Sequence, residues 1–337
     1  KGRAELNFSL DPAPGFYNAV LYLVKDGVRT ELTRTNLGFN PTQIISEQDK
    51  QPDFDSFWAG TLAELAAVDM EPKLTLLKEH SNAVRQAYRV EMKSLGGETI
   101  SGLLYMPVAD GIYPAMISYM GYGSEVWYAD PSSNPQMIEF MLCVRNQAFN
   151  RKPGEKDDWC ARGIADKDTY YYRGAFADAV RAIDFVCSLE KTDIDRVFAN
   201  GESQGGALTL AAASLDGRLK AIAPSAPFLC DYPDYFVLAG WPGEPIKAAA
   251  KEAGMSEEEM FKVLSYFDIK NFTDRIQCPV IMAIGLQDDV CPPHTNFAGY
   301  NHIRTEKSWI CYPAAAHNVW QQAGWPLAKE DFFEKYL

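Results

Sequence analysis

The fold of this chain is decided by one stretch of sequence, Arg196-Val197-Phe198-Ala199-Asn200-Gly201-Glu202-Ser203-Gln204-Gly205-Gly206-Ala207-Leu208-Thr209-Leu210. An apolar strand-like segment precedes a G-x-S-x-G motif centred on Ser203, and an apolar helix-like segment follows it. Such a strand–turn–helix holds a serine hydroxyl out at the carboxyl edge of a sheet, and Gly201 and Gly205 let its two arms approach closely. Because the N-terminus of a helix also favours developing negative charge, the stretch predicts Ser203 as a nucleophile.

Strand and helix patterns alternate around this stretch. Apolar strands are predicted at residues 115–120, 140–144, 197–200, 221–223, 280–284 and 309–312, and helices at 174–189 and 207–215. Two antiparallel strands, 84–92 and 99–106, and an amphipathic helix that begins near Asp53 precede them. This order predicts an α/β protein of the α/β-hydrolase type, with a mostly parallel central sheet covered by helices on both faces and a short N-terminal β segment.

Two units are expected along the chain. Residues 1–45 are predicted to form a β-strand segment, and residues 46–337 an α/β-hydrolase catalytic domain with an insertion at about 228–268, where Ser256-Glu257-Glu258-Glu259 forms a capping box. The strands of the first unit are predicted at 5–10, 16–24 and 28–35, with a hairpin turn at Lys25-Asp26-Gly27. Because so few strands cannot bury a two-sided core, we expect this segment to pack on the catalytic domain or to be the remnant of a β-sandwich.

The composition excludes several classes of partner. Hydrophobic residues make up 47% of the chain and charged residues 23%, as in globular proteins, and no apolar run approaches the roughly 18 residues of a membrane span. A formal net charge of −13 opposes binding to nucleic acid and to membranes with an anionic surface. The seven cysteines form no C-x-x-C pair, so neither a zinc knuckle nor a small disulfide scaffold is indicated.

The location of the protein in the cell is left open by its sequence. The chain starts at Lys1, without an initiator methionine or a signal-like apolar stretch. We expect a periplasmic or secreted location if a preceding segment carried a signal, and a cytoplasmic location otherwise.

A serine hydroxyl needs a base to remove its proton, and histidine is the usual base near neutral pH. The chain has four histidines. His80 precedes the elbow, against the chain order of serine, acid and histidine that this fold uses. His294 and His302 follow too closely on the strand expected to carry the acid. His317 lies after the last predicted strand, 309–312, and is therefore the expected base.

The acid and the donors for the oxyanion are expected at the carboxyl ends of neighbouring strands. The strand at 280–284 leads into Asp288-Asp289, and either carboxylate could accept the proton of the imidazole Nδ1. The backbone N–H of Gln204, directly after the nucleophile, is one expected donor. The loop Gly121-Tyr122-Gly123 is flexible enough to supply the second.

These residues resemble the acetyl xylan esterase and cephalosporin C deacetylase family, from about Pro52 to the C-terminus. The matching motifs are Pro52-Asp53-Phe54-Asp55-Ser56-Phe57-Trp58, Gly121-Tyr122-Gly123, Tyr170-Tyr171-Tyr172-Arg173, Asp178-Ala179-Val180-Arg181-Ala182, Gly201-Glu202-Ser203-Gln204-Gly205-Gly206, Gly285-Leu286-Gln287-Asp288 and Cys291-Pro292-Pro293. The resemblance aligns the family's acid with Asp288 and its oxyanion N–H with Tyr122. The family's R-G-Q stands here as Arg145-Asn146-Gln147, which gives Arg145 and Gln147 a supporting role. Its H-E pair stands here as His317-Asn318.

The resemblance implies a serine carboxylesterase that removes acetyl groups from small acetylated carbohydrates such as xylo-oligosaccharides, through an acyl-enzyme and without metal or cofactor. A homo-oligomer is compatible with it, and neither nucleic acid nor membrane is an expected partner. The residues by themselves predict only a serine hydrolase of esters or amides, so a peptidase or thioesterase of the same fold is one alternative. The departures at Asn146 and Asn318 leave open a second alternative, which is a catalytically impaired carbohydrate-binding homologue.

Overall fold

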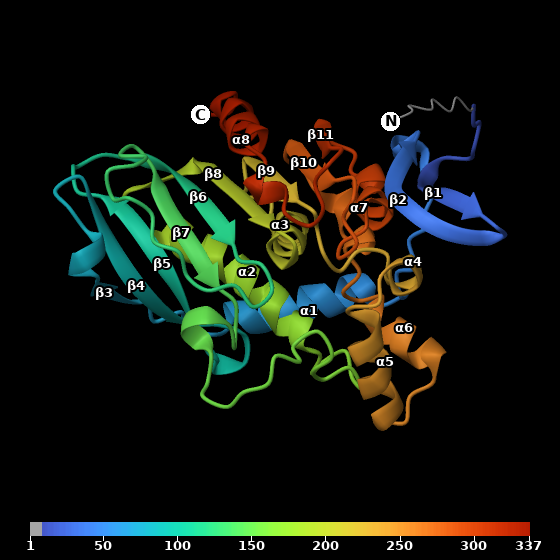
Figure 1. Cartoon of the computed structure of the whole chain (residues 1–337). Coiled ribbons are helices and arrows are strands. Elements are labelled where there is room, and N and C mark those ends of the chain that lie inside the picture. The colour runs from blue at the N-terminus through green and yellow to red at the C-terminus, as the bar shows by residue number, and fades with distance from the viewer. Residues whose placement is uncertain (1–8) are drawn as a thin grey trace.

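A nine-stranded sheet forms the centre of the protein in a computed structural model that describes residues 9–337 (Figure 1). The strand order is β11-β10-β9-β8-β6-β7-β5-β4-β3. The strands are β3 (Lys73–Leu76), β4 (Arg85–Lys93), β5 (Thr99–Pro107), β6 (Tyr113–Tyr119), β7 (Ile138–Cys143), β8 (Thr192–Glu202), β9 (Ala221–Ser225), β10 (Val280–Gly285) and β11 (Lys307–Tyr312). Strands β7, β6, β8, β9, β10 and β11 run parallel, whereas β5, β4 and β3 are each antiparallel to their neighbours.

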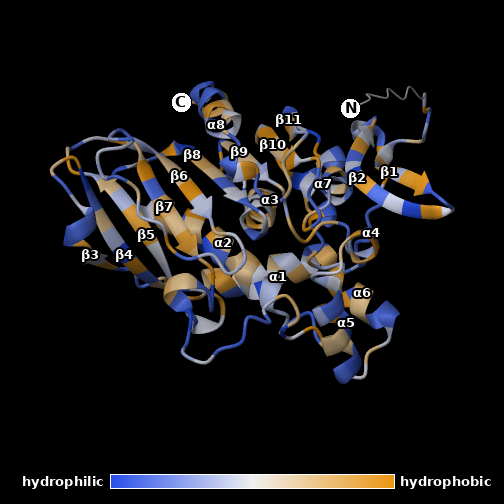
Figure 2. Cartoon of the chain, viewed as in Figure 1, coloured by the Kyte–Doolittle hydropathy of each residue, from blue (hydrophilic) through white to orange (hydrophobic). Residues whose placement is uncertain are grey.

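Helices cover both faces of this sheet. They are α1 (Phe54–Ala66), α2 (Tyr171–Ser188), α3 (Gln204–Leu215), α4 (Tyr232–Leu238), α5 (Gly243–Glu252), α6 (Glu257–Leu264), α7 (Pro293–His302) and α8 (Gly324–Glu334). Because successive strand residues point to opposite faces, Val197 and Ala199 of β8 join the core beneath α1, α2 and α3, while Phe198 joins the core beneath α8. Apolar residues follow the strands of the sheet in Figure 2. The predicted α/β-hydrolase fold is thereby confirmed.

Strand β3 and helix α8 are among the elements that the sequence patterns missed. Strand β3 is short and lies exposed at the edge of the sheet, so it has no buried apolar face from which a strand could be predicted. Helix α8 buries only Trp325, Phe332 and Phe333, a sparse apolar stripe on an otherwise exposed helix. The predicted helix at 207–215 is right but begins earlier, because α3 starts at Gln204, immediately after Ser203.

The N-terminal hairpin lies beside α7, apart from the main sheet (Figure 1). Strand β1 (Gly15–Lys25) pairs with β2 (Val28–Phe39), and both residues of the tight turn, Asp26 and Gly27, have positive φ, as hairpin turns require. Phe16 packs on Phe297 of α7, with 5.8 Å between ring centroids. The predicted hairpin is confirmed, whereas the strand expected at 5–10 lies largely outside the described residues, and residues 9 and 10 form no strand.

Three helices stand between β9 and β10. Helices α4, α5 and α6 follow one another there, and α5 and α6 protrude from the body below α4 in Figure 1. The predicted capping box is present, because the Ser256 side chain accepts the Glu259 N–H and the Glu259 side chain accepts the Ser256 N–H. Within residues 9–337, no helix is both long enough and apolar enough to cross a membrane.

Candidate active site

Ser203 occupies a strained turn between β8 and α3. Its φ of 58° and ψ of −120° lie outside the regions that residues with a side chain favour, a conformation that costs about 1–3 kcal/mol. Two backbone hydrogen bonds hold it: the Ser203 N–H donates to Ser225 O at 3.0 Å, and the Phe228 N–H donates to Ser203 O at 3.0 Å. The sheet therefore fixes a side chain that would otherwise relax away from the edge.

The two glycines that flank Ser203 are required by close backbone approaches. A Cβ on Gly201 would lie 2.4 Å from Gly205 O, and a Cβ on Gly205 would lie 2.0 Å from Tyr119 O. No side chain fits at either distance, so the motif's spacing follows from the packing of α3 against β8 and β6.

His317 and Asp288 form a hydrogen-bonded pair. The His317 Nδ1 lies 2.8 Å from Asp288 Oδ2, and the other carboxylate oxygen accepts the N–H groups of Val290 at 2.9 Å and Cys291 at 2.8 Å. Asp288 is buried, with 4% of its surface exposed. Asp289 is exposed and makes no side-chain hydrogen bond among the described residues, so of the two aspartates only Asp288 is placed to orient the imidazole.

The pairing with Asp288 alters the basicity of His317. Burial alone disfavours the imidazolium, but hydrogen bonding to Asp288 and the neighbouring Cys291 outweigh it and raise the pKa of His317 above its usual value. An imidazole with a raised pKa holds a proton more firmly once it has accepted one. The pair is therefore suited to receive a proton from a nearby hydroxyl.

Cys291, three residues after Asp288, lies beside Ser203, a position that the spacing of the cysteines does not predict. Its Sγ is 4.0 Å from Ser203 Oγ and 3.5 Å from the Tyr235 hydroxyl, and burial raises the pKa of the thiol. Its position three residues after Asp288 was the available signal. Ser203 and His317 line the same cavity, but in the described part of the chain they share no hydrogen bond. Hydrogen bonds between catalytic groups are often long without substrate and shorten only when substrate binds.

The expected oxyanion donors have backbone N–H groups without acceptors in the described part of the chain. They belong to Tyr122, in the loop after β6, and Gln204, the first residue of α3. Gln147 supports both segments, because its Oε1 accepts the Gly123 N–H at 2.9 Å and its Nε2 donates to Gln204 Oε1 at 3.1 Å. Gln147 thus links the loop after β6 to the first residue of α3.

Arg145 supports the site from further away. Its guanidinium binds both oxygens of the buried Asp178 on α2, at 2.8 and 2.7 Å, and its carbonyl accepts the Tyr171 hydroxyl at 2.6 Å. The next residue, Asn146, has a φ of 63°, a left-handed conformation that glycine adopts freely and asparagine tolerates. The asparagine that replaces the family's glycine is therefore accommodated without displacing Arg145 or Gln147.

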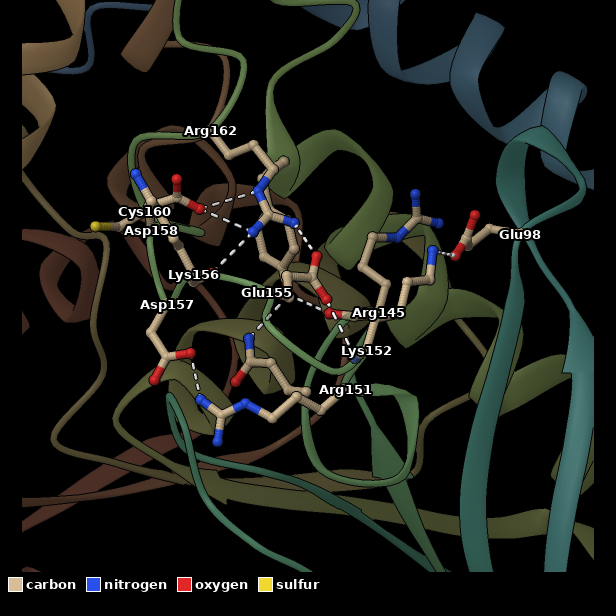
Figure 3. A network of polar contacts seen from close by, with 12 residues as sticks. Glu98, Arg145, Arg151, Lys152, Glu155, Lys156, Asp157, Asp158, Cys160 and Arg162 are labelled. Carbon is tan, nitrogen blue, oxygen red and sulfur yellow. Dashed lines mark hydrogen bonds and ion pairs between the residues drawn. The ribbon is translucent and has the colours of Figure 1, made fainter.

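A network of ion pairs orders the loop that follows Arg145 (Figure 3). Arg162 binds Glu155 at 2.6 Å and Asp158 at 2.8 Å. The Tyr122 hydroxyl donates to the Asp157 carbonyl of this loop at 3.0 Å, and the Tyr122 ring packs on Trp159 with 5.0 Å between centroids. Each exposed ion pair contributes at most about 1 kcal/mol to the stability of the fold. The main effect of these ion pairs is therefore to hold the loop against Tyr122.

A cavity of about 690 Å³ opens beside Ser203 and His317. Tyr122 and Ser124 line it from the loop after β6, and Trp320 lines it from the segment after His317. Its volume lies within the range of small-molecule sites. Ser203, His317 and the loop that contains Tyr122 therefore border one space.

The other three histidines lie elsewhere. His80 stacks on Tyr128, with 3.6 Å between ring centroids, and His302 contacts Ser46 O at 2.7 Å. His294 lies 2.9 Å from Asp234, and in the described part of the chain these two and Asp231 form the one group spaced to hold a cation. We assign no metal to it, because the Lys270 ammonium already lies 2.9 Å from Asp231.

Comparisons with known proteins find acetyl xylan esterases among the similar sequences and structures. The family model described as acetyl xylan esterase matches residues 42–325. The acetyl esterase Axe7A of Xylanibacter ruminicola is 30% identical over 336 residues, covering 94% of this chain and 74% of its own length. An acetyl xylan esterase structure from Paenibacillus sp. R4 superposes with a TM-score of 0.81 at 32% identity, over 88% of this chain and 98% of its own. For acetyl xylan esterase 1 from Thermoanaerobacterium sp., the TM-score is 0.79 at 28% identity, with the same coverage.

Proposed function

Because this chain belongs to the acetyl xylan esterase family and is an esterase, we propose that it removes acetyl groups from acetylated carbohydrates such as xylo-oligosaccharides, with Ser203, His317 and Asp288 as its catalytic triad. The observation that carries the proposal is the hydrogen-bonded His317–Asp288 pair, which borders the same cavity as Ser203 at its strained elbow. The family supports a carbohydrate acetyl esterase, and the triad and the xylan-type substrate are our inference.

In the first half-reaction the Ser203 hydroxyl attacks the acetyl carbonyl carbon while His317 accepts its proton. The carbonyl oxygen becomes an oxyanion, and the backbone N–H groups of Tyr122 and Gln204 stabilise it by hydrogen bonding. Asp288 fixes the tautomer of His317 and stabilises the imidazolium. The tetrahedral intermediate then collapses: the bond to the sugar oxygen breaks, His317 donates its proton to that oxygen, and acetyl-Ser203 remains.

The second half-reaction regenerates the serine. Water attacks the acetyl carbon of the acyl-enzyme, and His317 accepts a proton from it. The same N–H groups hold the second oxyanion, and the carbon–oxygen bond to Ser203 breaks as His317 returns a proton to Oγ. Acetic acid leaves, and every proton transfer uses the same imidazole.

Asn318 stands where the family has a glutamate, and this difference bears on the alternative that the protein is a catalytically impaired homologue. The Asn318 side chain donates to Gln321 Oε1 at 2.9 Å and makes no hydrogen bond with Asp288 or the imidazole among the described residues. The His317–Asp288 contact therefore forms without a glutamate at this position, which favours an active enzyme over an impaired carbohydrate-binding homologue.

Acetate release tests the proposal. We expect the parent enzyme to release acetate from acetylated xylo-oligosaccharides, and to act more slowly on longer acyl esters and on amides. Ser203→Ala is expected to lower kcat by roughly 10⁵- to 10⁶-fold, whereas Ser308→Ala, an exposed serine on β11, serves as the matched control. Undiminished hydrolysis by Ser203→Ala would refute the nucleophile, and a preference for amides or long acyl thioesters would favour the peptidase or thioesterase alternative.

A further inference from the structure

The cavity beside Ser203 continues past the catalytic residues along one face of the sheet. Strand register places Ser118 of β6 beside Asn200 of β8, and Glu202 of β8 beside Ser225 of β9, and all four line the cavity. Deeper on the same face, Phe198 is buried against α8. The face that is apolar under α8 thus becomes polar where the strands end, next to the nucleophile.

Helix α8 forms the opposite wall of this extension. Its Trp325, Pro326 and Lys329 line the cavity together with Trp320, which precedes the helix. The Lys329 ammonium makes no ion pair or hydrogen bond with any residue of 9–337. Burial lowers the pKa of Lys329, and the nearby Glu202 carboxylate opposes this effect. The ammonium lies over the Trp325 ring, 5.6 Å from its centroid, but its N–H groups have no hydrogen-bond acceptor in the described part of the chain. Such donors, partly buried beside a cavity, point to a polar ligand.

Glu202 lies opposite this ammonium group on the strand that carries the nucleophile. One carboxylate oxygen accepts the Ser225 hydroxyl at 3.3 Å. Burial raises the pKa of Glu202 to about 7, although the positive imidazolium of His317 would lower it. A carboxylate has about four acceptor sites, so several remain for hydroxyl groups of a ligand in the cavity.

We propose that Glu202 and Lys329 form a subsite for the sugar ring that leaves when the acetyl group is removed. Sugar hydroxyls both donate and accept hydrogen bonds, so neighbouring hydroxyls of a neutral pyranose can donate to Glu202 and accept from Lys329. The exposed indole of Trp320, with 63% of its surface accessible, offers an apolar face to the C–H groups of the ring. When Glu202 is ionised, its negative charge offsets the positive charge of Lys329, which favours a neutral sugar over a charged one.

The position of His317 assigns this subsite to the alcohol side of the ester. The inference rests on the proposed function, in which His317 donates its proton to the sugar oxygen as the carbon–oxygen bond breaks. That oxygen must therefore lie beside His317, and the chain from His317 onward supplies Trp320 and Lys329 to the cavity wall. The sugar attached to the oxygen extends into the space between these residues and Glu202.

Substrate discrimination tests the subsite. We compare kcat/KM for acetylated xylo-oligosaccharides with kcat/KM for p-nitrophenyl acetate, whose leaving group lacks hydroxyls to fill the subsite. The ratio of the two is expected to fall about tenfold or more in Lys329→Met and in Glu202→Gln, chiefly through KM for the sugar ester. Lys335→Met and Glu330→Gln, exposed residues near the same helix, are the matched controls. A ratio that stays within twofold of the parent in both cavity variants would overturn the subsite.

A binding measurement separates this inference from the proposed function. Xylotriose, which carries no acetyl group, is titrated into the parent and into Lys329→Met while tryptophan fluorescence is followed. We expect Lys329→Met to bind about tenfold more weakly, whether or not the parent releases acetate. Failure of the parent to deacetylate any sugar would overturn the proposed function alone, whereas absent or equal xylotriose binding in the two proteins would overturn the subsite.

Discussion

We predict that Gln287→Ala lowers both the catalytic rate and the stability of the fold. Gln287 directly precedes Asp288, and its side-chain amide joins three segments. Its Oε1 accepts the Asn36 N–H at 2.7 Å, and its Nε2 donates to Asn36 O at 3.2 Å and to Pro313 O at 2.9 Å. Asn36 belongs to β2, and Pro313 begins the loop that carries His317. One side chain therefore links the N-terminal hairpin, the acid loop and the histidine loop.

The size of the effect follows from these contacts. Each intramolecular hydrogen bond contributes a net of about 0.5–1.5 kcal/mol, and partial exposure places these three in the lower half of that range. Their loss lowers the free energy of unfolding by about 1.5–3 kcal/mol. The hydrogen bond from Asn36 Nδ2 to Leu286 O, at 2.9 Å, remains in the variant and limits the displacement of the hairpin. Misplacement of Asp288 by a fraction of an ångström lowers kcat roughly tenfold.

Steady-state kinetics on p-nitrophenyl acetate and urea unfolding measure the two effects. We expect KM to change little, because Gln287 does not line the cavity. Gln43→Ala is the matched control, since Gln43 is exposed and its side chain makes no hydrogen bond within residues 9–337. A Gln287→Ala variant whose kcat and unfolding free energy both equal those of the parent would show that these hydrogen bonds hold neither the acid loop nor the hairpin in place.

Two further predictions concern the charged groups. His317 must be neutral to accept a proton, so activity rises with pH through the pKa of His317. Because Asp288 raises that pKa, Asp288→Asn should move the rising limb of the kcat/KM profile to lower pH and reduce the maximum of kcat/KM roughly 10⁴-fold. A rising limb that stays at the same pH would contradict the pairing of His317 with Asp288. Arg145→Ala leaves the fully buried carboxylate of Asp178 without its bidentate partner and should lower the unfolding free energy by about 3–5 kcal/mol in urea denaturation. The control Arg151→Ala removes only exposed ion pairs and should lower it by less than about 1 kcal/mol. Equal losses in the two variants would contradict this ranking.

The parts of the fold that could be predicted from the sequence are those that local rules govern. The elbow needs glycine at Gly201 and Gly205 because backbone atoms approach them too closely for any Cβ, and that constraint is written directly into the sequence. The parallel strands read as short apolar runs because both of their faces are buried. The order of nucleophile, acid and histidine along the chain, which this fold shares, selected His317 from four histidines.

The remaining features depend on contacts between distant segments, which no local pattern encodes. Asp288 and Asp289 are adjacent in sequence and identical in type, and only the folded acid loop turns one of them toward His317. The link from Gln287 to Asn36 spans 251 residues of chain. The wall formed by Lys329 exists only because α8 packs on the sheet through a few large side chains. Sequence patterns therefore predicted the chemistry at Ser203 and left the shape of the surrounding cavity open.

Covalent labelling with a fluorophosphonate tests whether Ser203 is the nucleophile of this esterase. We expect activity to be lost in step with labelling. Mass spectrometry of digested protein should find the phosphonyl group on the peptide containing Ser203, and Ser203→Ala should remain unlabelled. A fully active protein that resists the reagent, or inactivation by a label attached to any other residue, would contradict the assignment of Ser203 as the nucleophile.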